Sequence, residues 1–184
     1  WALTGSSDDT AKLWRLEGGG AGGEARQARQ VREVATLAGH SDVVTSVAFS
    51  PDGNWALTGS GDDTAKLWRL EGSRAGGQSR QVREVATLAG HSGWVFSVAF
   101  SPDGNWALTG SSDDTAKLWR LEGGGAGGEA RQARQVREVA TLAGHSDVVT
   151  SVAFSPDGNW ALTGSGDDTA KLWRLEGSRA GGQS

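Results

Sequence analysis

Several things are missing from this 184-residue chain, and each absence narrows what it can be. It contains no cysteine, which excludes disulfides and thiolate metal sites and fits a reducing compartment such as the cytoplasm. Its apolar runs are far shorter than the roughly 20 residues that span a bilayer, so we expect neither a membrane segment nor a secretory signal. The net charge is only −4, and without a basic excess or an acidic run nothing indicates binding to nucleic acid.

Methionine is also absent, and the chain begins at Trp1 inside an apolar run. A translated chain begins with methionine, so we expect that residues upstream of Trp1 were removed or omitted. Both ends are therefore expected to be cuts through a repeat, which makes a longer chain the simplest expectation.

What the chain has instead is repetition, together with 29 glycines. Residues 1–79 recur without a change as residues 106–184. The segment WALTGS begins four times, at Trp1, Trp55, Trp106 and Trp160. The underlying unit therefore has about 50 residues and comes in two alternating versions. Identity over so long a stretch indicates either recent amplification or deliberate design.

One unit, from Val82 to Leu121, predicts four short strands. The stretch VREVATLA ends at a Gly-His pair, and the β-branched and aromatic run VFSVAFS ends at the turn sequence Pro-Asp-Gly-Asn. WALTGS and AKLWRL follow, separated by a turn that contains two aspartates. A single such sheet cannot bury both of its faces, whereas sheets stacked around an axis bury one another, as in a propeller. The glycine-rich stretches 17–30, 71–81 and 122–135 are predicted to be connecting loops.

The unit GHSDVVTSVAFSPDGNWALTGSGDDTAKLW strongly resembles the repeats of the WD-repeat family. The matching features are the Gly-His pair, the segment VAFSPDG, the GSxDxT turn and the tryptophan of KLW, and they cover the chain apart from the glycine-rich loops. The resemblance implies an all-β fold, a β-propeller of four-stranded antiparallel blades. One feature departs from the family pattern: the aspartate expected after each tryptophan is replaced by Arg15, Arg69, Arg120 and Arg174.

The resemblance also implies a hydrogen-bonded set of histidine, serine or threonine, aspartate and tryptophan in each blade. By motif match the complete sets are His40, Ser60, Asp62 and Trp68, then His91, Ser111, Asp113 and Trp119, then His145, Ser165, Asp167 and Trp173. The first unit lacks the histidine and offers Ser6, Asp8 and Trp14. The chemistry is consistent, because an indole N–H only donates, a carboxylate only accepts, and a hydroxyl and an imidazole can link them.

Histidines near serines and aspartates could also indicate a hydrolase triad. Each histidine, however, occupies the same place in its unit, whereas a catalytic site is expected once in a chain. The Asp62-Asp63 pair could suggest calcium, but an EF-hand loop needs alternating ligands closed by a glutamate. We therefore expect a chain that is not an enzyme, with no catalytic residue, no metal and no cofactor.

We letter the four strands of a blade a to d, from the propeller axis outward. The predicted strands then follow the order b-c, and after it d-a-b-c three times. The units are residues 1–31, which form a partial blade with its loop, then 32–81, 82–135 and 136–184. About 3.5–4 blades leave an open arc with apolar end faces and unpaired sheet edges, which invite association. We therefore predict that the chain pairs with itself. Two copies close a ring of eight blades, or of six or seven if terminal strands are shared or displaced.

The resemblance finally implies a non-catalytic scaffold that binds a protein or peptide on its top face, where the d–a and b–c loops lie. The candidate binding residues there are Asp42, Val43, Trp94, Phe96, Asp147 and Val148. Trp94 and Phe96 replace Val43 and Thr45 of the other unit version, and exposed aromatic residues are common in binding sites. Two alternatives stay open: Trp94 packs between blades, or the chain is an engineered or recently amplified repeat with no evolved ligand.

Overall fold

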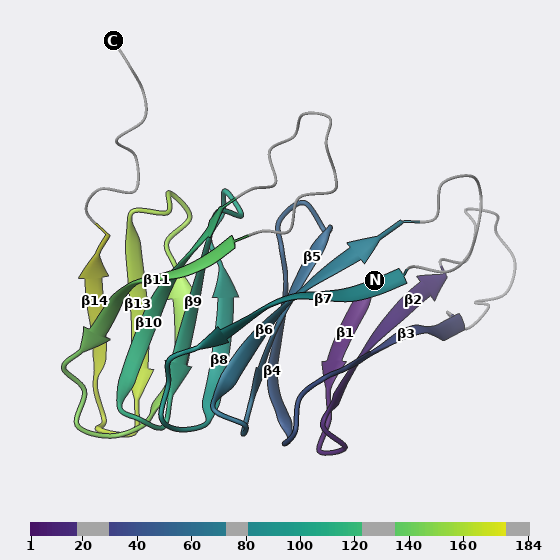
Figure 1. The fold of residues 1–184 in the computed structure, drawn as a ribbon. Coiled ribbons are helices and arrows are strands. Elements are labelled where there is room, and N and C mark those ends of the chain that lie inside the picture. Colours follow the sequence, from purple (N-terminus) through teal and green to yellow (C-terminus); the bar gives the residue numbers. More distant parts are fainter. Residues whose placement is uncertain (18–29, 73–80, 123–134, 176–184) are drawn as a thin grey trace, which may run out of the picture.

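The computed structural model describes residues 1–17, 30–72, 81–122 and 135–175, which form fourteen β-strands in four antiparallel sheets. Figure 1 shows the sheets standing side by side in chain order, with the first strands at one end and the last at the other. The predicted glycine-rich loops lie almost entirely outside the described residues. Among the residues described, no helix is long and apolar enough to cross a membrane.

Two of the sheets have four strands in the sequential order a to d. Blade 2 consists of β4 (Val44–Phe49), β5 (Trp55–Ser60), β6 (Thr64–Glu71) and β7 (Gln81–Ala89). Blade 3 consists of β8 (Val95–Phe100), β9 (Trp106–Ser111), β10 (Thr115–Glu122) and β11 (Gln135–Ala143).

The two end sheets have three strands each. Blade 1, which has no strand a, consists of β1 (Ala2–Gly5), β2 (Thr10–Glu17) and β3 (Gln30–Ala38). Blade 4, which has no strand d among the described residues, consists of β12 (Val149–Phe154), β13 (Trp160–Ser165) and β14 (Ala170–Arg174). The predicted all-β, incomplete β-propeller is therefore confirmed. Sequence units and blades are offset by one strand, because the first strand of each unit is the outer strand of the preceding blade.

Residues that tolerate a positive φ form the tight turns. In the a–b turns Gly53, Gly104 and Gly158 have φ angles of 68°, 70° and 71°, a region that favours glycine. Gly53 N donates to Ser50 O over 2.9 Å, which closes the predicted turn. In the b–c turns the second aspartate takes this conformation, as at Asp63 with a φ of 65°. Aspartate is enriched there among residues other than glycine, so the paired aspartates are explained by turn chemistry.

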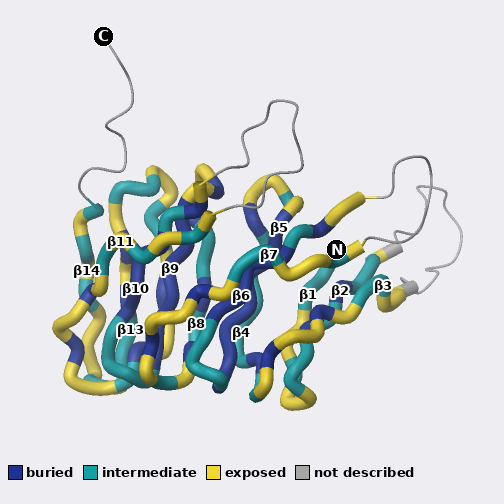
Figure 2. Tube along the Cα trace, viewed as in Figure 1, coloured by how far each residue is buried: buried dark blue, intermediate teal, exposed yellow. Residues whose placement is uncertain are grey.

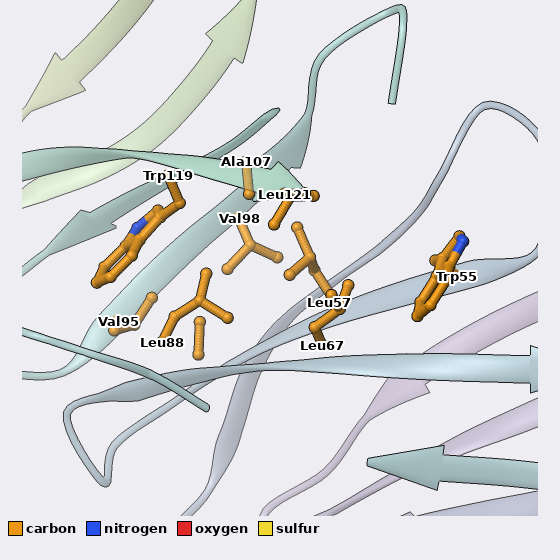
Figure 3. Close-up of a cluster of buried hydrophobic side chains, with 10 residues drawn as sticks. Trp55, Leu57, Leu67, Leu88, Val95, Val98, Ala107, Trp119 and Leu121 are labelled. Atoms are coloured by element: carbon orange, nitrogen blue, oxygen red, sulfur yellow. The ribbon is translucent and has the colours of Figure 1, made fainter. Parts of the chain in front are cut away.

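The hydrophobic core lies between neighbouring blades. Leu57 and Leu67 of blade 2 belong to the same buried cluster as Val95 and Val98 of blade 3 (Figure 3). Hydrogen bonds cross the same boundaries, because Val98 N donates to Ser46 Oγ (3.1 Å) and Val152 N donates to Ser97 Oγ (3.2 Å). Each strand a therefore packs on the preceding blade through both apolar and polar contacts.

Close approach of the blades explains a glycine in strand b. A Cβ added to Gly59 would lie 2.9 Å from Val95 Cγ1 of the next blade, which is closer than real Cβ atoms come. The same holds at Gly110, where Val152 Cγ1 would be 2.8 Å away. At the equivalent Gly164 of blade 4 the nearest atom is Ser151 Cβ, at 3.8 Å. Glycine is thus needed only where another blade follows.

Candidate functional site

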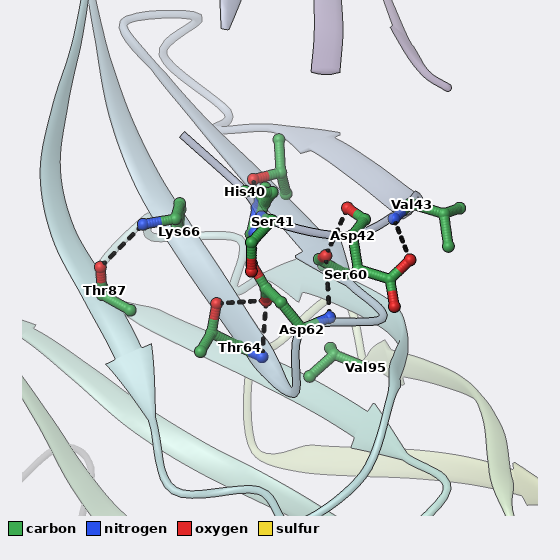
Figure 4. Close-up of polar contacts among 12 residues, drawn as sticks. His40, Ser41, Asp42, Val43, Ser60, Asp62, Thr64, Lys66, Thr87 and Val95 are labelled. Atoms are coloured by element: carbon green, nitrogen blue, oxygen red, sulfur yellow. Dashed lines mark hydrogen bonds and ion pairs between the residues drawn. The ribbon is translucent and has the colours of Figure 1, made fainter. Parts of the chain in front are cut away.

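A largely buried chain of hydrogen bonds links four side chains of blade 2. Trp68 Nε1 donates to Thr58 Oγ1 over 2.9 Å, and Thr58 Oγ1 lies 2.6 Å from His40 Nε2. On its other side, His40 Nδ1 lies 2.8 Å from Asp62 Oδ2 (Figure 4). With its proton on Nδ1, the imidazole donates to the carboxylate and accepts from the hydroxyl, so every polar atom of the chain has a partner.

The same hydrogen-bond chain recurs in the two following blades. The equivalent side chains are Trp119, Thr109, His91 and Asp113 in blade 3, and Trp173, Thr163, His145 and Asp167 in blade 4. Blade 1 holds part of the arrangement, since Trp14 Nε1 donates to Thr4 Oγ1 (2.9 Å) and Asp8 N donates to Ser6 Oγ (3.2 Å).

The bridging hydroxyl belongs to a threonine and not to the serine that motif matching assigned. Ser60 lies two residues beyond Thr58 on β5, where its Oγ donates to Asp42 O (2.9 Å) and accepts from Asp62 N (3.1 Å). It therefore ties the b–c turn to the d–a loop. Ser111 and Ser165 do the same in their blades. Side chains two residues apart share one face of a strand, so the motif alone did not show which hydroxyl reaches the histidine.

The environment of these histidines is suited to a structural role. Burial lowers the pKa of His40 and of His91, although the carboxylates of Asp62 and Asp113 act in the opposite direction. Thr58 is fully buried, so its hydroxyl is not open to a substrate as a nucleophile must be. The arrangement fastens the d–a loop to the b–c turn. Within the described ranges, no group of three or more histidines and carboxylates could hold a metal ion.

The candidate top-face residues fall into two groups. At the boundary of blades 2 and 3, a Cβ added to Gly61 would lie 2.8 Å from Asp42 Oδ2 and 3.2 Å from Trp94 Cε2, so these residues meet. Trp94 is 43% exposed, and its ring is tilted by 51° to that of Phe96 at a centroid distance of 6.1 Å. Val43 N donates to Asp42 Oδ1 in the same loop. The structure thus brings Asp42, Val43, Trp94 and Phe96 to one region.

The second group, Asp147 and Val148, lies in the equivalent loop of blade 4, beside Gly166. Val148 N donates to Asp147 Oδ1 over 2.7 Å, which repeats the conformation of the loop in blade 2. The b–c turns at this end each carry two aspartates and no basic residue. The end of the blades that holds both groups is therefore rich in carboxylates.

Blade 4 ends the array with an exposed apolar face. Leu162 and Leu172 are 47% and 64% exposed, whereas Leu57 and Leu67, which occupy the same places in blade 2, are both 0% exposed. Because residues 160–174 repeat residues 55–69 without a change, the difference comes from the surroundings: among the described residues, blade 4 has neither a following blade nor a strand d. Figure 2 shows the contrast between the buried middle strands β9 and β10 and the less buried β14.

The repeats match a known protein family. The family described as WD domain, G-beta repeat matches residues 31–69, 82–120 and 136–174. The chain belongs to the WD-repeat family. Each matched segment runs from an outer strand d through strands a and b to strand c of the next blade. The resemblance inferred from the Gly-His pair, the VAFSPDG segment and the GSxDxT turn is confirmed.

Individual WD-repeat relatives are longer than this chain. Striatin-3 of Homo sapiens is 33% identical over 140 residues, which are 75% of this chain and 17% of that protein. The ribosome biogenesis protein WDR12 homolog of Drosophila mojavensis is 32% identical over 183 residues, 95% of this chain and 39% of that protein. Protein tipD of Dictyostelium discoideum is 34% identical over 138 residues, 75% of this chain and 19% of that protein. The chain spans less than half the length of each. WD-repeat proteins generally act as non-catalytic scaffolds that bind other proteins.

The arginine that replaces the aspartate of the WD-repeat pattern contacts a tryptophan. Arg69 pairs with Trp55 in the register of β5 and β6, and Arg120 pairs with Trp106 in that of β9 and β10. In both pairs the guanidinium carbon lies 4.9 Å from the indole centroid. Each contact contributes on the order of 0.5–2 kcal/mol as a cation–π interaction. The arginine at this position therefore contributes a stabilising contact within the blade.

Proposed function

We propose that this WD-repeat chain is a non-catalytic protein-interaction module whose copies associate through the exposed face of blade 4. The observation that carries the proposal is the exposure of Leu162 and Leu172, whose identical counterparts in blade 2 are fully covered. Full burial of a leucine side chain contributes roughly 1.5–3 kcal/mol, so covering this face favours association.

The partner that fits this face is another blade of the same kind. On blade 2 the equivalent face is covered by β8, whose Val95 lies against Gly59 and whose Val98 N–H donates to Ser46. Blade 4 repeats both features, with the small Gly164 in strand b and an exposed Ser151 in strand a. The free end of a second copy is blade 1, which presents β1 and has no strand a, so its contact with blade 4 would rest on the exposed leucines and not on a strand at Gly164. We propose that two copies close one ring of eight blades, or of six or seven if end strands are shared or displaced.

Leu172→Lys tests the association. This side chain is 64% exposed in the single chain, so a lysine there leaves the blade intact but places a charge in any contact that covers the face. Light scattering at micromolar concentration is expected to give the mass of two copies for the unaltered protein and of one copy for Leu172→Lys, with unchanged circular dichroism. Val139→Ala, at an exposed position on β11 of blade 3 and away from both ends of the array, serves as the control and keeps the double mass. A single-copy mass for the unaltered protein throughout this range would contradict the proposal.

A second candidate function, binding of a protein or peptide on the top face, is favoured by the exposure of Trp94. The residue lies beside the carboxylate of Asp42 at the acidic end of the blades. An aromatic ring next to a carboxylate suits a segment that carries lysine or arginine. We therefore propose a basic partner segment. The cytoplasmic location inferred from the absence of cysteine stays a prediction.

Calorimetric titration with a lysine- and arginine-rich peptide tests this second function. The basic peptide is expected to bind and a glutamate-rich peptide of equal length is not, while Trp94→Ala weakens binding and Val31→Ala does not. If neither peptide binds, the top-face proposal is wrong, and the alternative of a recently amplified or engineered repeat with no evolved ligand is favoured.

A further inference from the structure

The two versions of the blade differ at a few described positions, and these positions gather at the boundaries between blades. Blade 2 carries Asp42 and Val43 in its d–a loop and Gly61 in its b–c turn, whereas blade 3 carries Gly93, Trp94 and Ser112 at these places. The glycine of blade 2 lies against the tryptophan of blade 3, since a Cβ on Gly61 would be 3.2 Å from Trp94 Cε2. Residues that distinguish the two blade versions, although separated in the sequence, therefore meet at one contact between blades 2 and 3.

Along the array, the smaller residue in a b–c turn is followed by the larger residue in the next d–a loop. The glycine turn of blade 2 is followed by Trp94, whereas the serine turns of blades 1 and 3 are followed by Val43 and Val148. We propose that Gly61 and Trp94 form a size-matched pair across the boundary between blades 2 and 3, and that this match stabilises the packing of the two blade versions on each other.

Exchanging either residue of the pair for its counterpart in the other blade version would destabilise the boundary. A tryptophan placed on a serine turn overpacks the contact, because the serine Cβ enters space that the indole occupies. A valine placed on the glycine turn leaves the space of the indole unfilled. Within the inner strand itself, β8 and β12 share the segment SVAF and differ only at Phe96 and Thr150. The stability of this boundary therefore depends on the match between the glycine and the indole.

The pair is independent of the association proposed above, because it lies inside a single chain. Gly166 provides the matched position for a test. Its own blade has the same loop sequence, and its three nearest atoms belong to Asp147 and Val148 of that blade. A serine at residue 61 or 166 meets an aspartate carboxylate, at 2.8 Å and 3.0 Å respectively, but only residue 61 also meets an indole. The difference between the two variants isolates the contact with Trp94.

Thermal unfolding of Gly61→Ser, Gly166→Ser, Trp94→Val and the double variant Gly61→Ser/Trp94→Val tests the pair. Gly61→Ser is expected to lower the unfolding midpoint by at least about 2 °C more than Gly166→Ser. In the Trp94→Val background, where residue 94 is valine as in the other version, adding Gly61→Ser is expected to lower the midpoint no more than Gly166→Ser does.

Two outcomes would contradict the proposed pairing of Gly61 with Trp94. One is an equal effect of Gly61→Ser and Gly166→Ser, and the other is a loss at Gly61→Ser that persists when Trp94 is replaced by valine. If Gly61→Ser alone does not fold, the double variant Gly61→Ser/Trp94→Val tests the proposal instead. It is expected to fold, because the indole that the serine would meet is then absent.

Discussion

At the scale of single residues, Thr58 shows how one hydroxyl can hold several elements together. It accepts from the indole N–H of Trp68 on β6 and contacts the imidazole of His40 in the d–a loop, which in turn contacts Asp62 in the b–c turn. The side chain of His40 is fully buried. Water therefore does not replace the hydroxyl as a partner of the ring nitrogen, and loss of the hydroxyl leaves two buried polar groups unpaired.

Thr58→Ala should lower the free energy of unfolding by about 1–3 kcal/mol, because an unpaired buried polar group retains its desolvation penalty. Thr58→Ser keeps the hydroxyl and loses only a methyl group, so it should retain most of that stability. Urea unfolding followed by circular dichroism measures both. The assigned role is wrong if the alanine and serine variants are equally stable, or if Ser60→Ala is the more destabilising change.

At the scale of elements, the contact between successive inner strands is the repeated unit of packing. Strand β8 donates from Val98 N to Ser46 of β4, and β12 donates from Val152 N to Ser97 of β8. Sheets in a propeller pack face to face, so backbone groups of one sheet seldom bond to the next. These serines accept from backbone N–H groups across the gap, which fixes the register between the inner strands of blades 2 and 3 and of blades 3 and 4.

Ser97→Ala should destabilise the protein by roughly 1 kcal/mol, because Val152 N–H then loses its partner in a partly buried place. Ser151→Ala is the matched control, since Ser151 is the same residue of the next strand and no blade follows it among the described residues. Urea unfolding of the two variants should differ by that amount. Equal stabilities would mean that the hydrogen bond between β8 and β12 contributes nothing measurable.

Strand order was predictable from the sequence, whereas the choice between two hydroxyls was not. The fourteen strands follow from β-rich runs bounded by Gly-His, Pro-Asp-Gly-Asn and paired aspartates, which are local signals. The hydrogen-bonded set depends on distances across β5 and β6, so Ser60 and Thr58 were indistinguishable on one strand face. The contact of Trp94 with Gly61 joins different units and depends on how blades stack, which no local pattern contains.

At the scale of the whole molecule, exact repetition places identical segments in different surroundings, so the effect of position in the array can be compared directly. The segment from Trp55 to Arg69 lies in the middle of the array, and the identical segment from Trp160 to Arg174 lies at its end. Thr58 and Thr163 keep the same hydrogen bonds from tryptophan, yet Leu67 is buried where Leu172 is exposed. Blade structure is therefore set within the unit, and burial of its outer faces is set by position in the array.

This position effect should be visible in hydrogen exchange measured by mass spectrometry. Peptides from residues 55–69 and 160–174 have one mass, so they should appear as two superposed isotope envelopes, a slow one from blade 2 and a fast one from blade 4. Amides exchange faster where fewer apolar contacts hold the local structure. If copies associate through blade 4, a higher protein concentration should move the fast envelope toward the slow one. In Leu172→Lys, where the 160–174 peptide has a mass of its own, that peptide should stay fast at every concentration. A single envelope at every concentration would show that the end blade is as well protected as the middle one, which contradicts the exposed face.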